Sequence, residues 1–173
     1  HRIFIGELIR ETEKSGKERF DKTLILANQG KVFFAIEELE KIKNDLSSVS
    51  EITGVSPEQI SKLKDLVKDI SLSISDMKKN IGVIGKGDDQ PVKYGKDLVK
   101  PLEIQIFWKN KGNNIGIAGV DVEFSIADGN AEITKVSKTN STGVAKCLVK
   151  KVMSSDNLII DAKPKLPQSI TSD

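Results

Sequence analysis

Few of the side chains that carry catalysis are present in this sequence. Its 173 residues include one histidine, His1, and one cysteine, Cys147. A single cysteine cannot close an internal disulfide, and one histidine at the end of the chain removes most catalytic and zinc sites that depend on imidazole. No Ser/His/Asp set, no catalytic pair of carboxylates and no Cys/His cluster can be assembled. We therefore expect no enzyme activity, no cofactor and no metal ion.

Aromatic residues, charge of one sign and long apolar runs are also scarce. The six Phe, one Trp and one Tyr are too few to stack on bases, and 27 Lys and Arg face 25 Asp and Glu, which argues against nucleic-acid binding. No apolar run approaches the roughly 20 residues that cross a bilayer. With 38% hydrophobic and 30% charged residues, the composition suits one or two globular units. Because the chain begins at His1 and not at Met, we expect a processed product or a piece of a longer protein.

The first half of the chain has the apolar period of amphipathic helices. One long helix is predicted at about 17–47, which Gly30 would divide if it acts as a break, and a second at about 57–81. Ser56 and Pro57 provide an N-terminal cap for the second helix. Two such helices with a short connection favour an antiparallel helical hairpin over residues 1–81. The hairpin would need a further partner, either a third element from about residue 2 to residue 8 or self-association.

The second predicted helix carries a strict heptad seam, in which apolar residues alternate in steps of three and four. Packing within one chain is the preferred interpretation of this seam, and a homodimer through it is the alternative. The stretch around Gly30 also resembles a tetratricopeptide-style helix pair over about 25 residues, without a repeat. The seam consists of Ile60, Leu63, Val67, Ile70, Ile74, Met77 and Ile81.

Residues 82–100 are expected to be a linker, because Gly, Asp and Pro interrupt every apolar stretch there. The run from Gly82 to Gly87 invites comparison with phosphate-binding loops, but its glycine spacing is reversed and it follows a helix. We interpret it as a helix stop that continues into a flexible linker.

Calcium binding is a weaker interpretation of the acidic turn residues. Calcium takes six to eight oxygen ligands from closely spaced residues, and no D-x-D-x-D-G loop is present. The residues concerned are interpreted as solvated turn positions. They are Asp88, Asp89, Asp121, Asp128 and Asn130.

After Pro101 the apolar period changes from about 3.6 to two, which is typical of half-buried strands. Six or seven strands are expected in residues 101–173, including one over 131–136, and turns rich in Gly and Asn separate them. This pattern predicts an antiparallel β-sandwich. Phe107 and Trp108 fall on opposite faces of one strand, so one is expected in the core and the other exposed as a binding anchor or packed. The fold class is therefore α+β with two units.

Three stretches of the second half carry a family resemblance. Residues 118–126 read AGVDVEFSI, residues 128–133 read DGNAEI, and residues 139–145 read TNSTGVA. This order resembles the bacterial immunoglobulin-like repeats of intimin and invasin type over about residues 101–163. In that family a G-V-x-V-x-F strand precedes a Gly-rich turn and a T-D-x-x-G-x-A hairpin. Asn140 stands in place of the usual Asp, but Asn also bonds back to its own backbone, and Gly143 would supply a positive φ.

The resemblance implies an immunoglobulin-like β-sandwich in the bacterial cell envelope, in the periplasm or on the outer surface. Cys147 would then be a small buried hydrophobe. A helical segment ahead of such a module also resembles bacterial envelope lipoproteins. The expected function is a non-enzymatic structural or protein-interaction module, as part of a lipoprotein or adhesin, with a protein partner. The alternatives are an accessory or spacer piece of a larger exported enzyme or transport complex that contacts carbohydrate, and a cytoplasmic coiled-coil adaptor.

Overall fold

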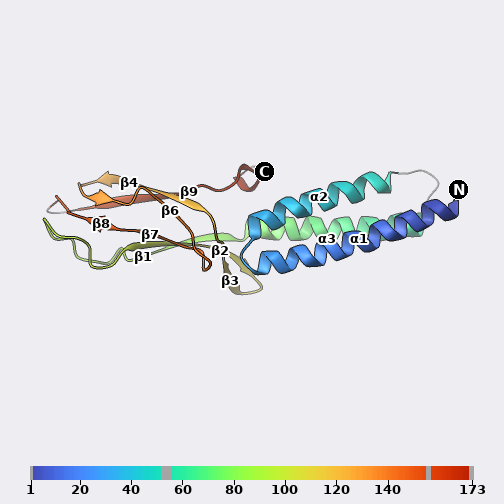
Figure 1. The fold of residues 1–173 in the computed structure, drawn as a ribbon, viewed down its shortest axis with the longest axis horizontal. Coiled ribbons are helices and arrows are strands. Elements are labelled where there is room, and N and C mark those ends of the chain that lie inside the picture. Colours follow the sequence, from blue (N-terminus) through green and yellow to red (C-terminus); the bar gives the residue numbers. More distant parts are fainter. Residues whose placement is uncertain (1, 52–55, 155–156, 172–173) are drawn as a thin grey trace. The chain divides into compact units, whose positions relative to one another are not determined.

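A computed structural model describes residues 2–51, 56–154 and 157–171. The chain forms two compact units, His1–Asn80 and Ile81–Asp173. The first unit is helical and the second is built mainly from antiparallel strands, so the fold is of the mixed α+β kind (Figure 1).

In the described residues, the helical unit contains three helices, not the expected two. They are α1 (Arg2–Asn28), α2 (Val32–Ser50) and α3 (Pro57–Lys79). The single helix expected at 17–47 is wrong, and the alternative of a break at Gly30 is confirmed. Gly30 has a φ of 93°, its amide donates to the carbonyl of Ala27, and the amide of Lys31 donates to that of Leu26. This pair of bonds is a Schellman motif, in which glycine takes the left-handed conformation after the last helical turn.

The beginning and end of α3 follow from its sequence. Ser56 is extended at the N-cap and accepts a hydrogen bond from the amide of Gln59, with Pro57 in the first turn, so the predicted cap is confirmed. The helix ends at Lys79, and Ile81 belongs to the first strand of the other unit. The expected end at residue 81 is therefore two residues too late.

Helix α2 packs against both α1 and α3 and supplies much of the buried surface of this unit (Figure 1). Apart from the neighbours Ala35 and Ile36, its buried positions recur in steps of three and four, as expected for a helix with one apolar stripe. Four seam residues of α3, Leu63, Ile70, Ile74 and Met77, are buried within the chain. Ile60 and Val67 are half-buried. The buried residues of α2 are Val32, Ala35, Ile36, Leu39, Ile42 and Leu46.

The second unit contains nine strands in the described part of the chain. One four-stranded sheet has the order β1-β2-β3, with β7 also paired to β2, one three-stranded sheet has the order β6-β4-β9, and β5 pairs with β8. All pairs are antiparallel. The strands are β1 (Ile81–Lys86), β2 (Leu102–Asn110), β3 (Asn113–Gly116), β4 (Asp121–Asp128), β5 (Glu132–Ile133), β6 (Val136–Lys138), β7 (Val144–Cys147), β8 (Val149–Lys150) and β9 (Ile159–Pro164). A short helix, α4 (Gln168–Thr171), follows.

The core of this unit lies between the two larger sheets. Figure 1 shows β4, β6 and β9 on one side and β1, β2 and β7 on the other. The alternation in β4 buries Val122 and Phe124, and that in β7 buries Ala145 and Cys147. This is the pattern of strands that each turn one face inward. The remaining buried residues are Ile106, Trp108, Ile117, Val120, Thr139, Val149 and Val152.

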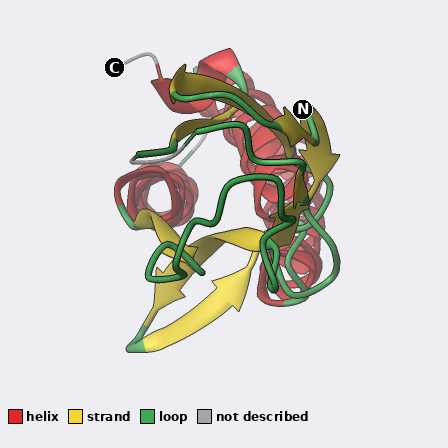
Figure 2. Ribbon diagram, turned by 90° about the vertical axis from the view of Figure 1, so that its left-hand side faces the viewer, coloured by secondary structure: helices red, strands yellow, loops and turns green. Residues whose placement is uncertain are grey.

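The segment expected as a linker, 82–100, belongs to this second unit. Its first part is strand β1, because Ile81 to Lys86 pair along β2 from Trp108 to Glu103. Its second part is a loop fastened to the region around β8. The amide of Leu98 donates to the carbonyl of Val149 over 2.9 Å. This loop lies at the end of the unit that faces the viewer in Figure 2. Backbone hydrogen bonds to β2 and to the region around β8 therefore order a segment whose composition suggested flexibility.

Candidate functional site

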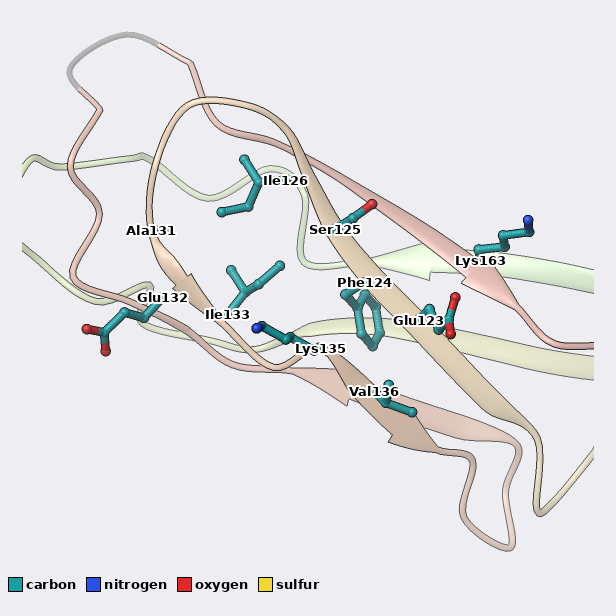
Figure 3. A pocket seen from close by; sticks show the side chains of 10 residues that line it. All are labelled: Glu123, Phe124, Ser125, Ile126, Ala131, Glu132, Ile133, Lys135, Val136 and Lys163. Carbon is teal, nitrogen blue, oxygen red and sulfur yellow. The ribbon is translucent and has the colours of Figure 1, made fainter.

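A groove beside β4 is one of the concave surfaces in the described part of the β-unit. We call it the β4 groove, and its cavity volume is about 730 Å³. Small-molecule and cofactor pockets of proteins have volumes in this range. The groove lies between the middle of β4 and the following segment, 131–136 (Figure 3). Its lining residues are Glu123, Phe124, Ser125, Ile126, Ala131, Glu132, Ile133, Lys135, Val136 and Lys163.

The groove exists because the chain changes sheets after β4. Strand β5 pairs with β8, whereas β6 pairs with β4. Thr134 lies between β5 and β6 and extends the contact of β5 with the β8 region. Its amide donates to the carbonyl of Leu148 over 3.1 Å, and its hydroxyl accepts from the Leu148 amide over 3.1 Å. The single strand expected over 131–136 is therefore wrong. Residues 132–133 and 136–138 belong to two different sheets. The groove lies beside β4 where the two segments separate.

One edge of β4 is only half covered as a result. Strand β6 pairs with Asp121 to Glu123, and the amide of Phe124 makes one more bond to the carbonyl of Lys135, of 2.8 Å. Beyond that point, no strand in the described residues pairs with this edge. On the opposite edge, β9 pairs with β4 as far as Asp128, with a register shift between Ile126 and Asp128. Beyond Phe124, the backbone groups of β4 that face the groove are therefore not paired with a strand of the described chain.

The walls of the groove are apolar. Phe124 forms the floor and is 4% exposed, and Ile126, Ala131 and Ile133 are half-buried. Val136 is 52% exposed at the rim. Figure 3 shows Phe124, Ile126 and Ile133 around the space between β4 and the facing segment. This surface favours apolar side chains over water.

The acidic side chains at the rim of the groove have ion-pair partners, whereas the lysines do not. Both acids have lysine partners outside the groove lining: Glu123 lies 2.7 Å from the amine of Lys165, and Glu132 lies 3.5 Å from that of Lys151. The Glu123 carboxylate raises the pKa of Lys165, chiefly by accepting its hydrogen bond. Lys135 and Lys163 have no ion-pair partner among the described residues, and both line the groove (Figure 3). The groove therefore offers two lysine amines that have no acidic partner in the described chain.

The residues considered for calcium are not brought together. Asp121 begins β4 and pairs with Lys138 over 3.2 Å, whereas Asp128 ends the same strand. Asp88 and Asp89 lie in the loop after β1 and are exposed. Within the described residues, no group of three or more His, Cys, Asp and Glu side chains is placed to hold a metal ion.

The run from Gly82 to Gly87 is a strand that ends in a turn, which excludes the geometry of a phosphate loop. Gly82 lies under the ring of Phe107, where a Cβ atom would overlap the ring. Gly87 has a φ of 92°, and a Cβ atom there would lie 2.8 Å from the carbonyl oxygen of Pro101. The interpretation as a helix stop and flexible linker is also wrong, because these glycines allow close packing in and after β1.

The aromatic pair on β2 is divided as its alternation predicts. Trp108 is 3% exposed, and Phe107 is half-buried against Gly82. Phe107 is therefore packed and is not a free binding anchor. Among the described residues of the β-unit, Tyr94 is the exposed aromatic side chain, at 62%.

No helix in the described part of the chain is both long and apolar enough to cross a membrane. No family model, curated protein or solved structure matches the chain. Sequence reasoning missed the β4 groove, since period two runs on through 131–136 and hides the sheet switch. The signal that was available is the polar pair Thr134-Lys135 in the middle of that stretch.

Proposed function

We propose that this chain is a non-enzymatic protein-interaction module of the bacterial cell envelope, in which a helical unit accompanies an immunoglobulin-like β-sandwich. The β4 groove is the observation that carries the interaction role. It combines apolar walls, an open strand edge and positive charge. These are the properties of a surface that binds another polypeptide.

The hairpin between β6 and β7 supports the immunoglobulin-like part of the proposal. The side-chain oxygen of Asn140 accepts hydrogen bonds from the amides of Thr142 and Val144, of 3.0 and 3.1 Å. Gly143 has a φ of 80°. Both features match what the T-N-S-T-G-V-A motif implies. The arrangement of β1, β2 and β7 opposite β6, β4 and β9 is also compatible with a sandwich.

The alternative of a carbohydrate-contacting spacer has less support. Sugar-binding sheets present aromatic rings that stack on the sugar. In the described residues of the β-unit, Tyr94 is the one largely exposed ring, and it lies in a loop rather than in a row on a sheet. A protein partner therefore fits the surface better than a glycan.

Two measurements in cells test the proposal. Fractionation and protease accessibility of the tagged full-length protein should place it in the periplasm or on the outer surface. A photo-crosslinking residue at Val136, 52% exposed at the groove, should capture protein. The same residue at Val83 is the matched control, 49% exposed on β1. A cytosolic location, or equal capture at both positions, would overturn the proposal.

A further inference from the structure

We infer that the β4 groove binds an extended peptide segment, which adds to the open edge of β4 as a further strand and carries a carboxylate toward Lys135. The inference deepens the proposed function, on which it rests, by naming the chemistry of the partner. Three independent features of the groove lead to it.

The first feature is the direction of the backbone groups. The amide of Phe124 points toward the groove side, because it donates to the carbonyl of Lys135. The carbonyl of Asp121 points to the other side, where it accepts from the amide of Lys165. Because backbone groups alternate along a strand, the amide of Ile126 faces the groove side as well. A peptide lying in the groove would continue this ladder beyond Phe124, whose amide is already bonded to Lys135.

The second feature is the apolar floor directly beside this edge. Strand addition gives affinity through main-chain bonds and selectivity through pockets that take every second side chain. Phe124 and Ile126 project from β4 on one face, two residues apart, and Ile133 faces them across the groove (Figure 3). An added strand with apolar residues at alternate positions would place them here.

The third feature is charge complementarity. The rim acids Glu123 and Glu132 are already paired with Lys165 and Lys151. Lys135 and Lys163 remain without such a partner in the described chain. A peptide with a carboxylate near Lys135 gains an ion pair, whereas a lysine at the same place meets like charge. The favoured occupant is therefore apolar and acidic.

The opposite edge of the same sheet is protected against such pairing. Strand β9 ends at Pro164, which has no amide hydrogen, and the exposed Lys165 follows it. Proline and lysine on an edge strand discourage further pairing. From Ser125 to Asp128 the groove edge of β4 has neither proline nor lysine, and its register with β9 shifts between Ile126 and Asp128.

The experiment uses the purified full chain and three fluorescein-labelled heptapeptides. The first alternates Val and Glu, the second alternates Val and Lys, and the third is the Val/Glu peptide with its backbone amides methylated along one edge. Fluorescence anisotropy should show binding of the Val/Glu peptide at about threefold to fivefold higher affinity than the Val/Lys peptide, which is the range of an exposed ion pair. The methylated peptide, which keeps the side chains but cannot join a ladder, should not bind.

Three variants locate the binding. Lys135→Glu should remove or reverse the preference for Val/Glu over Val/Lys. Lys109→Glu makes the same charge change on an exposed residue of β2 and should leave the preference unaltered. Ala131→Leu adds bulk to the groove wall and should weaken all binding. The fluorescence of Trp108 and the far-ultraviolet circular dichroism check that each variant is folded.

No binding of the Val/Glu peptide up to about 1 mM would overturn the inference. Equal binding of the methylated peptide would overturn strand addition, and an equal effect of the Lys135 and Lys109 variants would overturn the place of binding. These outcomes concern the purified chain alone. The proposed envelope function is tested separately by location and crosslinking in cells, so either idea can fail without the other.

Discussion

The backbones of Gly116 and Gly143 pack directly against each other, with no space for a side chain between them. A Cβ atom on Gly143 would lie 2.8 Å from the Cα of Gly116 and would overlap the carbonyl oxygen of Ile106. This contact lies where β2, β3 and the hairpin before β7 meet. The amide of Ile106 donates to the carbonyl of Gly143 over 2.8 Å, so the close approach also completes a hydrogen bond.

Replacing Gly143 with alanine should therefore lower the free energy of unfolding of the β-unit by about 3 kcal/mol. The left-handed conformation costs an alanine roughly 1–2 kcal/mol, and the overlap adds roughly 1–3 kcal/mol. Urea unfolding followed by Trp108 fluorescence measures this loss. Gly119→Ala is the matched control, because Gly119 has a φ of 78° but nothing lies within 4 Å of its Cβ position. Equal losses for the two variants would show that packing against Gly116 contributes nothing.

The side chain of Asn140 organises the same hairpin, so Asn140→Ala should destabilise the β-unit. One oxygen accepts from the amides of Thr142 and Val144 and from the Thr142 hydroxyl, over 3.0, 3.1 and 2.8 Å. Loss of these bonds should cost about 1–3 kcal/mol. Asn140→Asp retains the accepting oxygen and should stay within about 0.5 kcal/mol of the native chain. Thermal melting of both variants measures the difference, and an Asp variant as unstable as the Ala variant would contradict this role of the oxygen.

The sequence predicts those features that depend on neighbouring residues. The cap at Ser56, the stop at Gly30 and the turn at Gly143 are each determined by a few local atoms, and all three are observed. Prediction from the sequence fails where the structure of a segment depends on contacts with residues that are distant in the chain. Residues 81–86 form a strand because β2 offers an edge, and residues 131–136 divide because β8 and β4 each capture one end. The β4 groove is a consequence of this division and was therefore not predictable from local pattern.

The buried hydroxyl of Thr139 joins two strand ends, so Thr139→Val should destabilise the β-unit although it preserves volume. Thr139 is 4% exposed. Its hydroxyl accepts from the amide of Val120 over 2.9 Å and donates to the carbonyl of Ile117 over 2.7 Å. Valine would leave both groups buried without this partner, at a cost of about 1–3 kcal/mol. Thr139→Ser keeps the hydroxyl and should retain most of the stability in the same urea titration. A valine variant as stable as the serine variant would contradict the prediction.

The seam of α3 should stabilise a single chain rather than a dimer. Leu63 is fully buried within the helical unit, whereas Leu72 on the same helix is 60% exposed. Leu63→Ala should lower the free energy of unfolding of this unit by about 3 kcal/mol, and Leu72→Ala should change it by no more than about 0.5 kcal/mol. Circular dichroism at 222 nm follows the helices, and light scattering gives the mass. A dimeric mass, with melting that depends on protein concentration, would instead favour the homodimer through Ile60 to Ile81.

Cys147 should be inert in the folded chain and should make stability fall at alkaline pH. Its side chain is fully buried, and burial raises the pKa of the thiol above its ordinary value. In the unfolded chain the thiol ionises at its ordinary pKa, whereas in the folded chain it stays protonated to higher pH. The unfolded state therefore releases a proton first, and stability decreases as pH rises through and above the ordinary thiol pKa.

Cys147→Ala removes this group and should remove its share of the alkaline loss, although the smaller side chain lowers stability at every pH. The comparison is thus between the slopes of stability against pH, not between absolute values. Reaction with Ellman's reagent gives a second readout: modification at neutral pH should be slow in the native chain and fast in denaturant. Rapid modification of the native chain, or identical slopes for the two chains above the ordinary thiol pKa, would contradict the burial of this thiol.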